Sequence, residues 1–178
     1  LSQPWDREPV PPGAAVLIVG SGLTMVDQVL SLLEAGHEGP IIAASRRGLL
    51  PQVHAPVEEL SWELGNMPPP GRIAPLMRWL REQARLREAQ GGTWRDVVDA
   101  TKPHLQAIWQ GLPTASRRSF LRHASAHWEV HRHRMPPSSG TRLAQARADG
   151  RLRLMRGRFD GASEDEAGQV TARLTLPR

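Results

Sequence analysis

The sequence predicts an α/β fold, because three different patterns follow one another along the chain. Two short apolar runs, residues 14–20 and 40–45, flank a helical pattern, as two parallel strands joined by a crossover helix do. The middle of the chain carries helical patterns only, and strand patterns return after residue 150. We therefore expect a βαβ core that is interrupted by a mainly helical insertion and ends in a pair of β-strands.

The expected core is discontinuous in the sequence. A Pro-rich, polar segment precedes the first apolar run and has the composition of a linker. Prolines also gather after the second apolar run, where the insertion is expected to begin. The predicted parts are a lead-in linker over 1–13, the core over 14–48 and 140–178, and the helical insertion over 49–139.

The first third of the chain predicts a compact βαβ unit. Residues 14–20 are apolar without interruption, as in a strand that is buried on both faces of a parallel sheet. In the helix expected over 23–36, apolar residues recur at spacings of three and four, and Gly36 ends the pattern. The second parallel strand is expected over 40–45.

The insertion predicts a loop followed by three helices. Prolines make 49–71 rich in loop structure. Helical periodicity follows over 72–89, 93–110 and 113–134. Thr93 is placed to cap the second of these helices, with Asp96 three residues on, and Pro103 is expected to bend or split it.

The last part of the chain returns to a mixed pattern. A short helix is expected over 140–149, and the apolar residues that follow predict a third strand over 152–155. Residues 160–168 are polar and predict a turn. Apolar and polar residues alternate over 170–176, which predicts a half-buried strand antiparallel to the strand before it.

The composition excludes several classes of protein. The 178 residues include no cysteine, so thiolate metal sites and dithiol redox chemistry are excluded. No apolar run approaches the roughly 18 residues of a membrane span, and the start lacks a signal-peptide pattern, so we expect a cytoplasmic protein without a membrane partner. The net charge of +5 is spread among arginines interleaved with acids, so no nucleic-acid partner is expected.

A glycine turn lies between the first predicted strand and its helix. Gly20 allows the tight turn, and Gly22 lets a phosphate approach the backbone without meeting a Cβ. The amides that open the helix then face the anion, and the Thr24 hydroxyl can donate as well. Met25 departs from the small residue usual at this position. The sequence predicts a dinucleotide site with contacts from Gly20, Ser21, Gly22, Leu23 and Thr24.

The residues after the second strand indicate which dinucleotide binds. A carboxylate there would accept hydrogen bonds from a ribose 2′-hydroxyl and repel a 2′-phosphate. The chain has Ser45, Arg46 and Arg47 instead. A guanidinium presents a planar pair of donors to phosphate oxygens, so these residues favour NADP(H). The alternative is that both arginines are solvated loop residues of an Arg-rich chain.

These motifs resemble a bacterial family of FAD/NAD(P)-binding oxidoreductases, similar in layout to flavin-containing monooxygenases. Residues 20–27, 45–51 and 130–136 carry the resemblance, which extends from about residue 14 onward. It implies that the chain is the NAD(P)H-binding part of a flavoprotein, with a helical insertion. It also implies that FAD is bound by a Gly-rich motif preceding Leu1, that the flavin domain of the parent protein is the partner, and that this chain alone is inactive.

Four histidines lie close together near the end of the insertion. His123, His127 and His131 recur at a spacing of four, which would place them on one face of a helix, and His133 follows. The first and third would be about 12 Å apart on a straight helix, so they could not share one metal ion. We expect a polar stripe rather than a metal site, with a place in a flavin or substrate pocket left open for His131 or His133.

Taken together, these residues predict an NADP(H)-binding domain that presents the nicotinamide to a flavin bound elsewhere in the parent protein. No catalytic residue is assigned, because no acid–base pair follows from the spacing. The alternative is a non-catalytic, Rossmann-like module whose Trp- and His-bearing insertion docks a protein partner. Met25 and the absence of an FAD motif keep this alternative open.

Overall fold

The computed structural model describes residues 10–69 and 71–177 and shows a mixed α/β protein. The chain forms two compact units. The sheet unit comprises the chain up to Val53 and from Met135 onward, and the helical unit comprises His54–Arg134. The insertion that the sequence predicts over 49–139 extends a few residues beyond this helical unit at each end. Residues 1–9 of the predicted linker lie outside the described residues.

The sheet unit is built on a parallel sheet of three strands in the order β1-β2-β3. These are β1 (Val16–Val19), β2 (Ile41–Ser45) and β3 (Leu152–Arg156). Ile18 pairs with Ala43, which pairs with Leu154 on its other side. The structure confirms the two predicted parallel strands and the predicted third strand, which lies beside the second.

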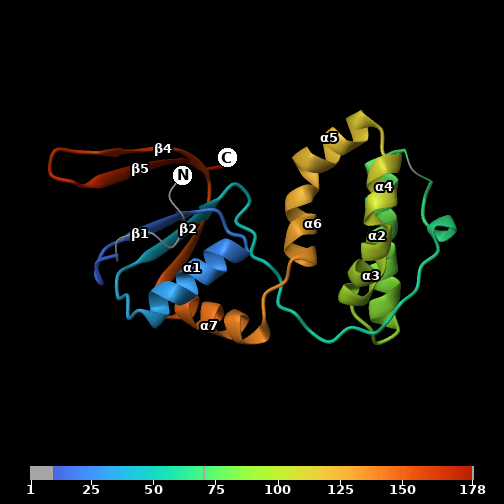
Figure 1. The fold of residues 1–178 in the computed structure, drawn as a ribbon, viewed down its shortest axis with the longest axis horizontal. Helices are drawn as coiled ribbons and strands as arrows, with labels where there is room; N and C mark the ends of the chain where they lie inside the picture. The colour runs from blue at the N-terminus through green and yellow to red at the C-terminus, as the bar shows by residue number, and fades with distance from the viewer. Residues whose placement is uncertain (1–9, 70, 178) are drawn as a thin grey trace. The chain divides into compact units, whose positions relative to one another are not determined.

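Two helices cover the same face of this sheet (Figure 1). They are α1 (Leu23–Glu34) and α7 (Pro137–Ala148), and they contact each other. Their apolar stripes are buried with Ile41 and Leu152 in one core cluster. The helix α7 begins at Pro137 rather than at residue 140, because proline is tolerated in the first turn, where its missing N–H costs nothing.

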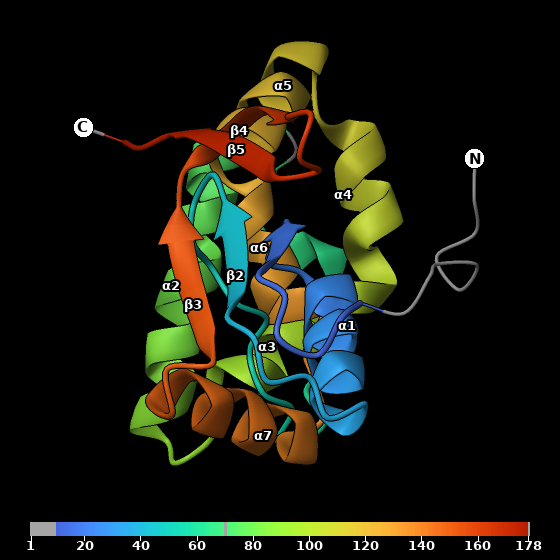
Figure 2. The ribbon, with the colours of Figure 1, turned by 90° about the vertical axis from the view of Figure 1, so that its left-hand side faces the viewer.

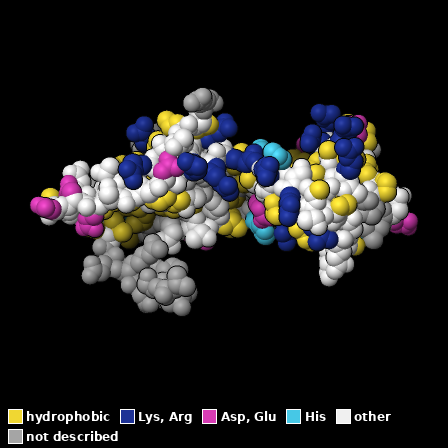
Figure 3. Space-filling model, turned by 90° about the horizontal axis from the view of Figure 1, so that it is seen from above, with side chains coloured by type: hydrophobic (Ala, Val, Ile, Leu, Met, Phe, Trp, Pro, Cys, Tyr) yellow, Lys and Arg dark blue, Asp and Glu magenta, His cyan; other side chains and the backbone are white. Residues whose placement is uncertain are grey.

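A β-hairpin ends the sheet unit. Strand β4 (Arg158–Glu164) pairs antiparallel with β5 (Val170–Thr175). The predicted turn over 160–168 is therefore wrong in its bounds, because its first half is β4, and the partner of the last strand is β4 rather than β3. The actual turn is short, and the Asp165 carboxylate accepts the N–H groups of Ala167 and Gln169 within it. Figure 3 shows acidic side chains gathered at the hairpin tip.

Among the described residues, the helical unit contains five α-helices and two short 3₁₀ helices. They are η1 (Leu64–Asn66), α2 (Ile73–Ala89), α3 (Trp94–Thr101), η2 (Lys102–His104), α4 (Leu105–Gly111), α5 (Thr114–His123) and α6 (Ser125–Arg132). Pro103 splits the second predicted helix into α3 and α4, as expected. The single helix predicted over 113–134 is wrong, because the chain breaks at Ala124 into α5 and α6.

One buried carboxylate holds three segments of the helical unit together. Thr93 caps α3 as predicted, since its hydroxyl accepts the Arg95 N–H at 3.1 Å. Asp96 accepts the Thr93 N–H at 2.9 Å, the Glu58 N–H at 3.0 Å and the Arg87 Nε at 2.8 Å. Asp96 therefore joins the loop before α2, the end of α2 and the start of α3.

The environment of Asp96 makes the helical unit sensitive to acid. Burial raises the pKa of Asp96, but the hydrogen bonds from Thr93, Arg87 and Glu58 outweigh burial and hold the pKa below its ordinary value of 3.8. A carboxylate with a lowered pKa stabilises the fold above its ordinary pKa. That contribution is lost as the pH falls through the lowered value.

Among the residues that the structure describes, no helix has both the length and the apolar composition needed to cross a membrane.

We predict that Asp96→Asn lowers the free energy of unfolding of the helical unit at pH 7 by about 1–3 kcal/mol, since the amide cannot accept all three bonds. The deficit should shrink at acid pH, as the pH falls through the lowered pKa of Asp96. Urea unfolding followed by tryptophan fluorescence measures this, because five of the six tryptophans lie in the helical unit. Glu88→Gln is the matched control. A loss of unfolding free energy that is the same at neutral and at acid pH would contradict the prediction.

Candidate functional site

The carboxyl ends of the three parallel strands meet at one edge of the sheet (Figure 2). The glycine turn follows β1 there, and the arginine loop, which we define as Ser45–Gly48, follows β2. Arg156 ends β3 at the same edge. The structure thus brings the two predicted motifs together, as parallel pairing requires of residues that follow adjacent strands.

The two glycines of the turn have different structural requirements. Gly20 has a φ of +120°, which side-chain-bearing residues rarely adopt, so the turn itself needs glycine there. Gly22 has an ordinary φ of −84°. A Cβ at Gly22 would meet no atom within 4 Å. Nothing within the described chain therefore requires glycine at position 22, and the space beside it is open.

The N-terminus of α1 faces this open space without a cap. Gly22 is the N-cap residue and offers no side-chain hydrogen bond, and no acidic residue lies in the first turn. Among the described residues, no partner is present for the N–H groups of Leu23 and Thr24. Unpaired amides at the positive end of a helix dipole form a binding site for an anion.

Two serine hydroxyls tie the glycine turn to the arginine loop. Ser21 Oγ lies 2.6 Å from the Leu49 carbonyl oxygen and 2.7 Å from Ser45 Oγ, and the Gly48 N–H donates to Ser45 Oγ at 3.0 Å. Because a carbonyl only accepts, the Ser21 hydroxyl donates to Leu49 and the Ser45 hydroxyl donates to Ser21. This chain of hydrogen bonds fixes the loop beside the turn.

Three arginines lie at this edge of the sheet. Arg46 and Arg47 are exposed in the loop after β2. Arg156 is also exposed, pairs in register with Ser45, and comes so close to Gly48 that a Cβ there would lie 3.3 Å from the Arg156 Cβ. Sequence reasoning missed Arg156, although its place as the last residue of a third parallel strand could have indicated it.

Met25 is accommodated inside the core of the sheet unit. It is 2% exposed and belongs to the same buried cluster as Val26, Ile41 and Ala43. Met25 therefore packs as one of the buried apolar side chains of this cluster. Met25, which replaces the usual small residue, is thus buried in the core. The space beside Gly22 in the glycine turn stays open.

The histidines do not form one straight stripe. His123 ends α5, whereas His127 and His131 lie on α6, where the His131 Nδ1 is 2.6 Å from the His127 carbonyl oxygen. The His133 Nε2 lies 3.0 Å from the Glu129 Oε2. Within 10–69 and 71–177, no three His, Asp or Glu side chains are grouped closely enough to hold a metal ion.

Comparisons of the chain with protein-family models, with curated proteins and with solved structures yield no match. The likeness to FAD/NAD(P)-binding oxidoreductases therefore rests on the motifs alone.

We predict that Ser45→Ala breaks the hydrogen-bond chain and loosens the loop. Gly48 loses the acceptor of its N–H, so its amide should exchange with solvent about fivefold faster, as expected for the loss of a bond worth about 1 kcal/mol. Hydrogen exchange followed by NMR measures this rate. Ser31→Ala, an exposed serine on α1, is the control. An unchanged rate at Gly48 would show that the loop is held by other contacts.

Proposed function

We propose that the sheet unit binds NADP(H) at the carboxyl edge of its sheet. The observation that carries this proposal is the open space at Gly22, where an uncapped helix N-terminus lies beside a loop with two exposed arginines. The strand order supports it, because β3-β2-β1 is the order of one half of a dinucleotide-binding fold.

In this proposal, the pyrophosphate binds at the glycine turn. The N–H groups of Leu23 and Thr24 would donate to its oxygens, and the helix dipole would favour its negative charge. Gly22 admits it because the backbone there is not covered by a side chain.

The arginine loop would hold the adenosine ribose and its 2′-phosphate. Arg46 and Arg47 are exposed, and their guanidinium groups would donate to phosphate oxygens. Arg156 adds a third cation at the same edge. The loop after β2 has no carboxylate that would repel the phosphate, so the residues present fit NADP(H) better than NAD(H).

The resemblance to FAD/NAD(P)-binding oxidoreductases supports a role for this unit as the nicotinamide-binding part of a flavoprotein. NADPH supplies a hydride when bound, and the sheet unit would orient the nucleotide and select it over NADH. The second Gly-rich motif that such proteins use for FAD does not occur in this sequence. We therefore propose that the hydride acceptor is a flavin held by the parent protein's flavin domain.

We predict that the chain binds NADPH more tightly than NADH, and that Arg46→Ala with Arg47→Ala removes the difference. The NADPH dissociation constant should rise at least about tenfold, because two charge-assisted contacts are lost, while that of NADH stays unchanged. Calorimetric titration measures both. Arg142→Ala is the control, because Arg142 pairs with Glu34 at the far end of α1.

Failure of both nucleotides to bind to the folded chain would overturn the proposal. That outcome would favour the alternative of a non-catalytic module that docks a protein partner. Equal binding of NADPH and NADH would leave the glycine turn as a site and overturn the role of the arginines.

We predict that Gly22→Asp separates folding from binding. Aspartate is among the best N-cap residues and Gly22 has ordinary dihedral angles, so the melting temperature should be unchanged or higher. Its carboxylate occupies the phosphate position, so NADPH affinity should fall by more than about tenfold. Gly13→Asp, also in open space, is the control with the same charge change. Retained affinity in the Gly22 variant would place the nucleotide elsewhere.

A further inference from the structure

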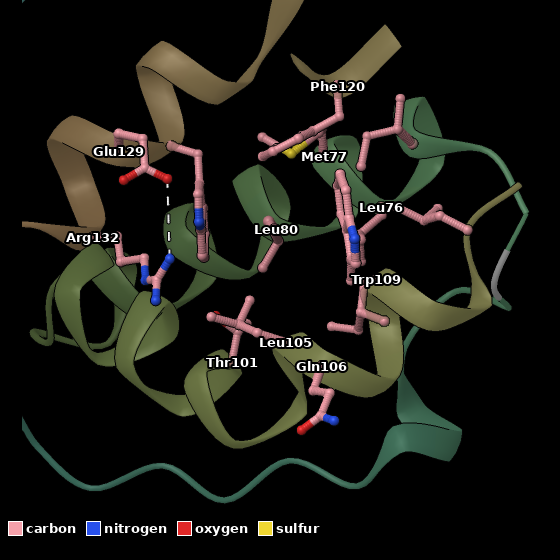
Figure 4. A pocket seen from close by; sticks show the side chains of 14 residues that line it. Leu76, Met77, Leu80, Thr101, Leu105, Gln106, Trp109, Phe120, Glu129 and Arg132 are labelled. Atoms are coloured by element: carbon pink, nitrogen blue, oxygen red, sulfur yellow. Dashed lines mark ion pairs between the residues drawn. The ribbon is translucent and has the colours of Figure 1, made fainter. Parts of the chain in front are cut away.

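The helical unit contains two adjoining cavities, both open to solvent, that the NADP(H) proposal does not use. The first, drawn in Figure 4, has a volume of about 350 Å³. Its walls are mainly apolar, with Leu76, Trp109 and Phe120 at one end. At the other end Glu129 and Arg132 lie 4.0 Å apart and offset each other's charge. This cavity carries no net preference for a charged ligand.

The second cavity is larger, at about 670 Å³, within the range of ligand pockets in proteins. It shares Met77, Leu80 and Trp128 with the first. The remaining apolar walls come from Ala84, Trp94, Val97, Val98 and Ala124. The polar side chains that line it are Arg81, His123, His127 and His131. The histidines that the sequence singles out therefore face one cavity, although they lie on two helices.

The charge of the second cavity is one-sided. All of its polar lining groups are basic, and none of the described residues that line it is Asp or Glu. The Arg95 and Arg134 guanidinium carbons lie 4.4 and 5.9 Å from the Trp94 ring centroid, and Arg134 also forms an ion pair with Asp99. Arg81 carries a positive charge that no lining carboxylate offsets, so this cavity favours an anion.

The aromatic walls are held in fixed positions. The rings of Trp94 and His131 meet edge to face with centroids 4.8 Å apart. The His131 Nδ1 donates to the His127 carbonyl oxygen, which leaves the Nε2 of the neutral ring as a hydrogen-bond acceptor. Trp128 separates this cavity from the first.

We propose that the second cavity binds a planar aromatic carboxylate. The ring would lie against Trp94 and Trp128, and the carboxylate would accept hydrogen bonds from Arg81 and from the ring N–H groups of His123 and His127. The site lies wholly within the helical unit, so it goes beyond the NADP(H) proposal and does not depend on it.

The test uses the full chain and three naphthalene probes followed by tryptophan fluorescence. Naphthalene-2-carboxylate should bind at least about tenfold more tightly than the neutral naphthalene-2-carboxamide, and the cationic 2-naphthylmethylamine should not bind. Arg81→Gln should reduce the carboxylate to the affinity of the carboxamide. Arg78→Gln, an exposed arginine one turn earlier on α2, should leave the affinity unchanged. NADPH affinity should be the same in both variants.

A second variant tests the cavity without removing charge. Ala84→Phe fills space that the structure shows to be empty, so carboxylate binding should be lost while the melting temperature is retained. Equal affinity for carboxylate and carboxamide, or no saturable binding to the folded chain, would overturn the proposal. So would a dimer in sedimentation that Ala84→Phe dissociates, since a second copy of the chain would then occupy the cavity.

Discussion

The sheet unit depends on the central position of β2. This strand forms hydrogen bonds with strands on both sides, and Ile41 and Ala43 are buried against the helices that cover one face. Because both pairings are parallel, β1, β2 and β3 end at the same edge of the sheet. The segments that follow the three strands therefore begin at that edge. The glycine turn, the two loop arginines and Arg156 come from distant parts of the sequence. Parallel pairing about one strand is what places them together.

The helical unit is organised around a buried charge. The Asp96 carboxylate accepts hydrogen bonds from the loop before α2, from the end of α2 and from the start of α3. Arg87 at the end of α2 offsets its negative charge. The cavities lie where the facing helices α5 and α6 meet α2 and α3. Asp96 lies on α3 beside Val97 and Val98, which line the second cavity, so the polar anchor holds one wall of that cavity in place.

Local sequence signals predicted much of the fold and part of the site. The βαβ unit, the Thr93 cap and the split at Pro103 each follow from a few adjacent residues. The break at Ala124 has no such signal, since neither glycine nor proline lies there. Strand β4 was missed because its small polar residues show no apolar alternation, and its pairing with β5 is what makes it a strand. Arg156 joins the site only through the pairing of β2 with β3.

The position of the helical unit within the chain has a consequence for biosynthesis. Strand β2 ends at Ser45 and its neighbour β3 begins at Leu152, with the whole helical unit between them. A ribosome therefore completes the helical unit before it makes β3, and until then one edge of the apolar β2 has no partner. An unpaired apolar strand edge is a template for pairing with other chains. The rate at which the nascent chain passes through this stage sets its exposure to aggregation during synthesis.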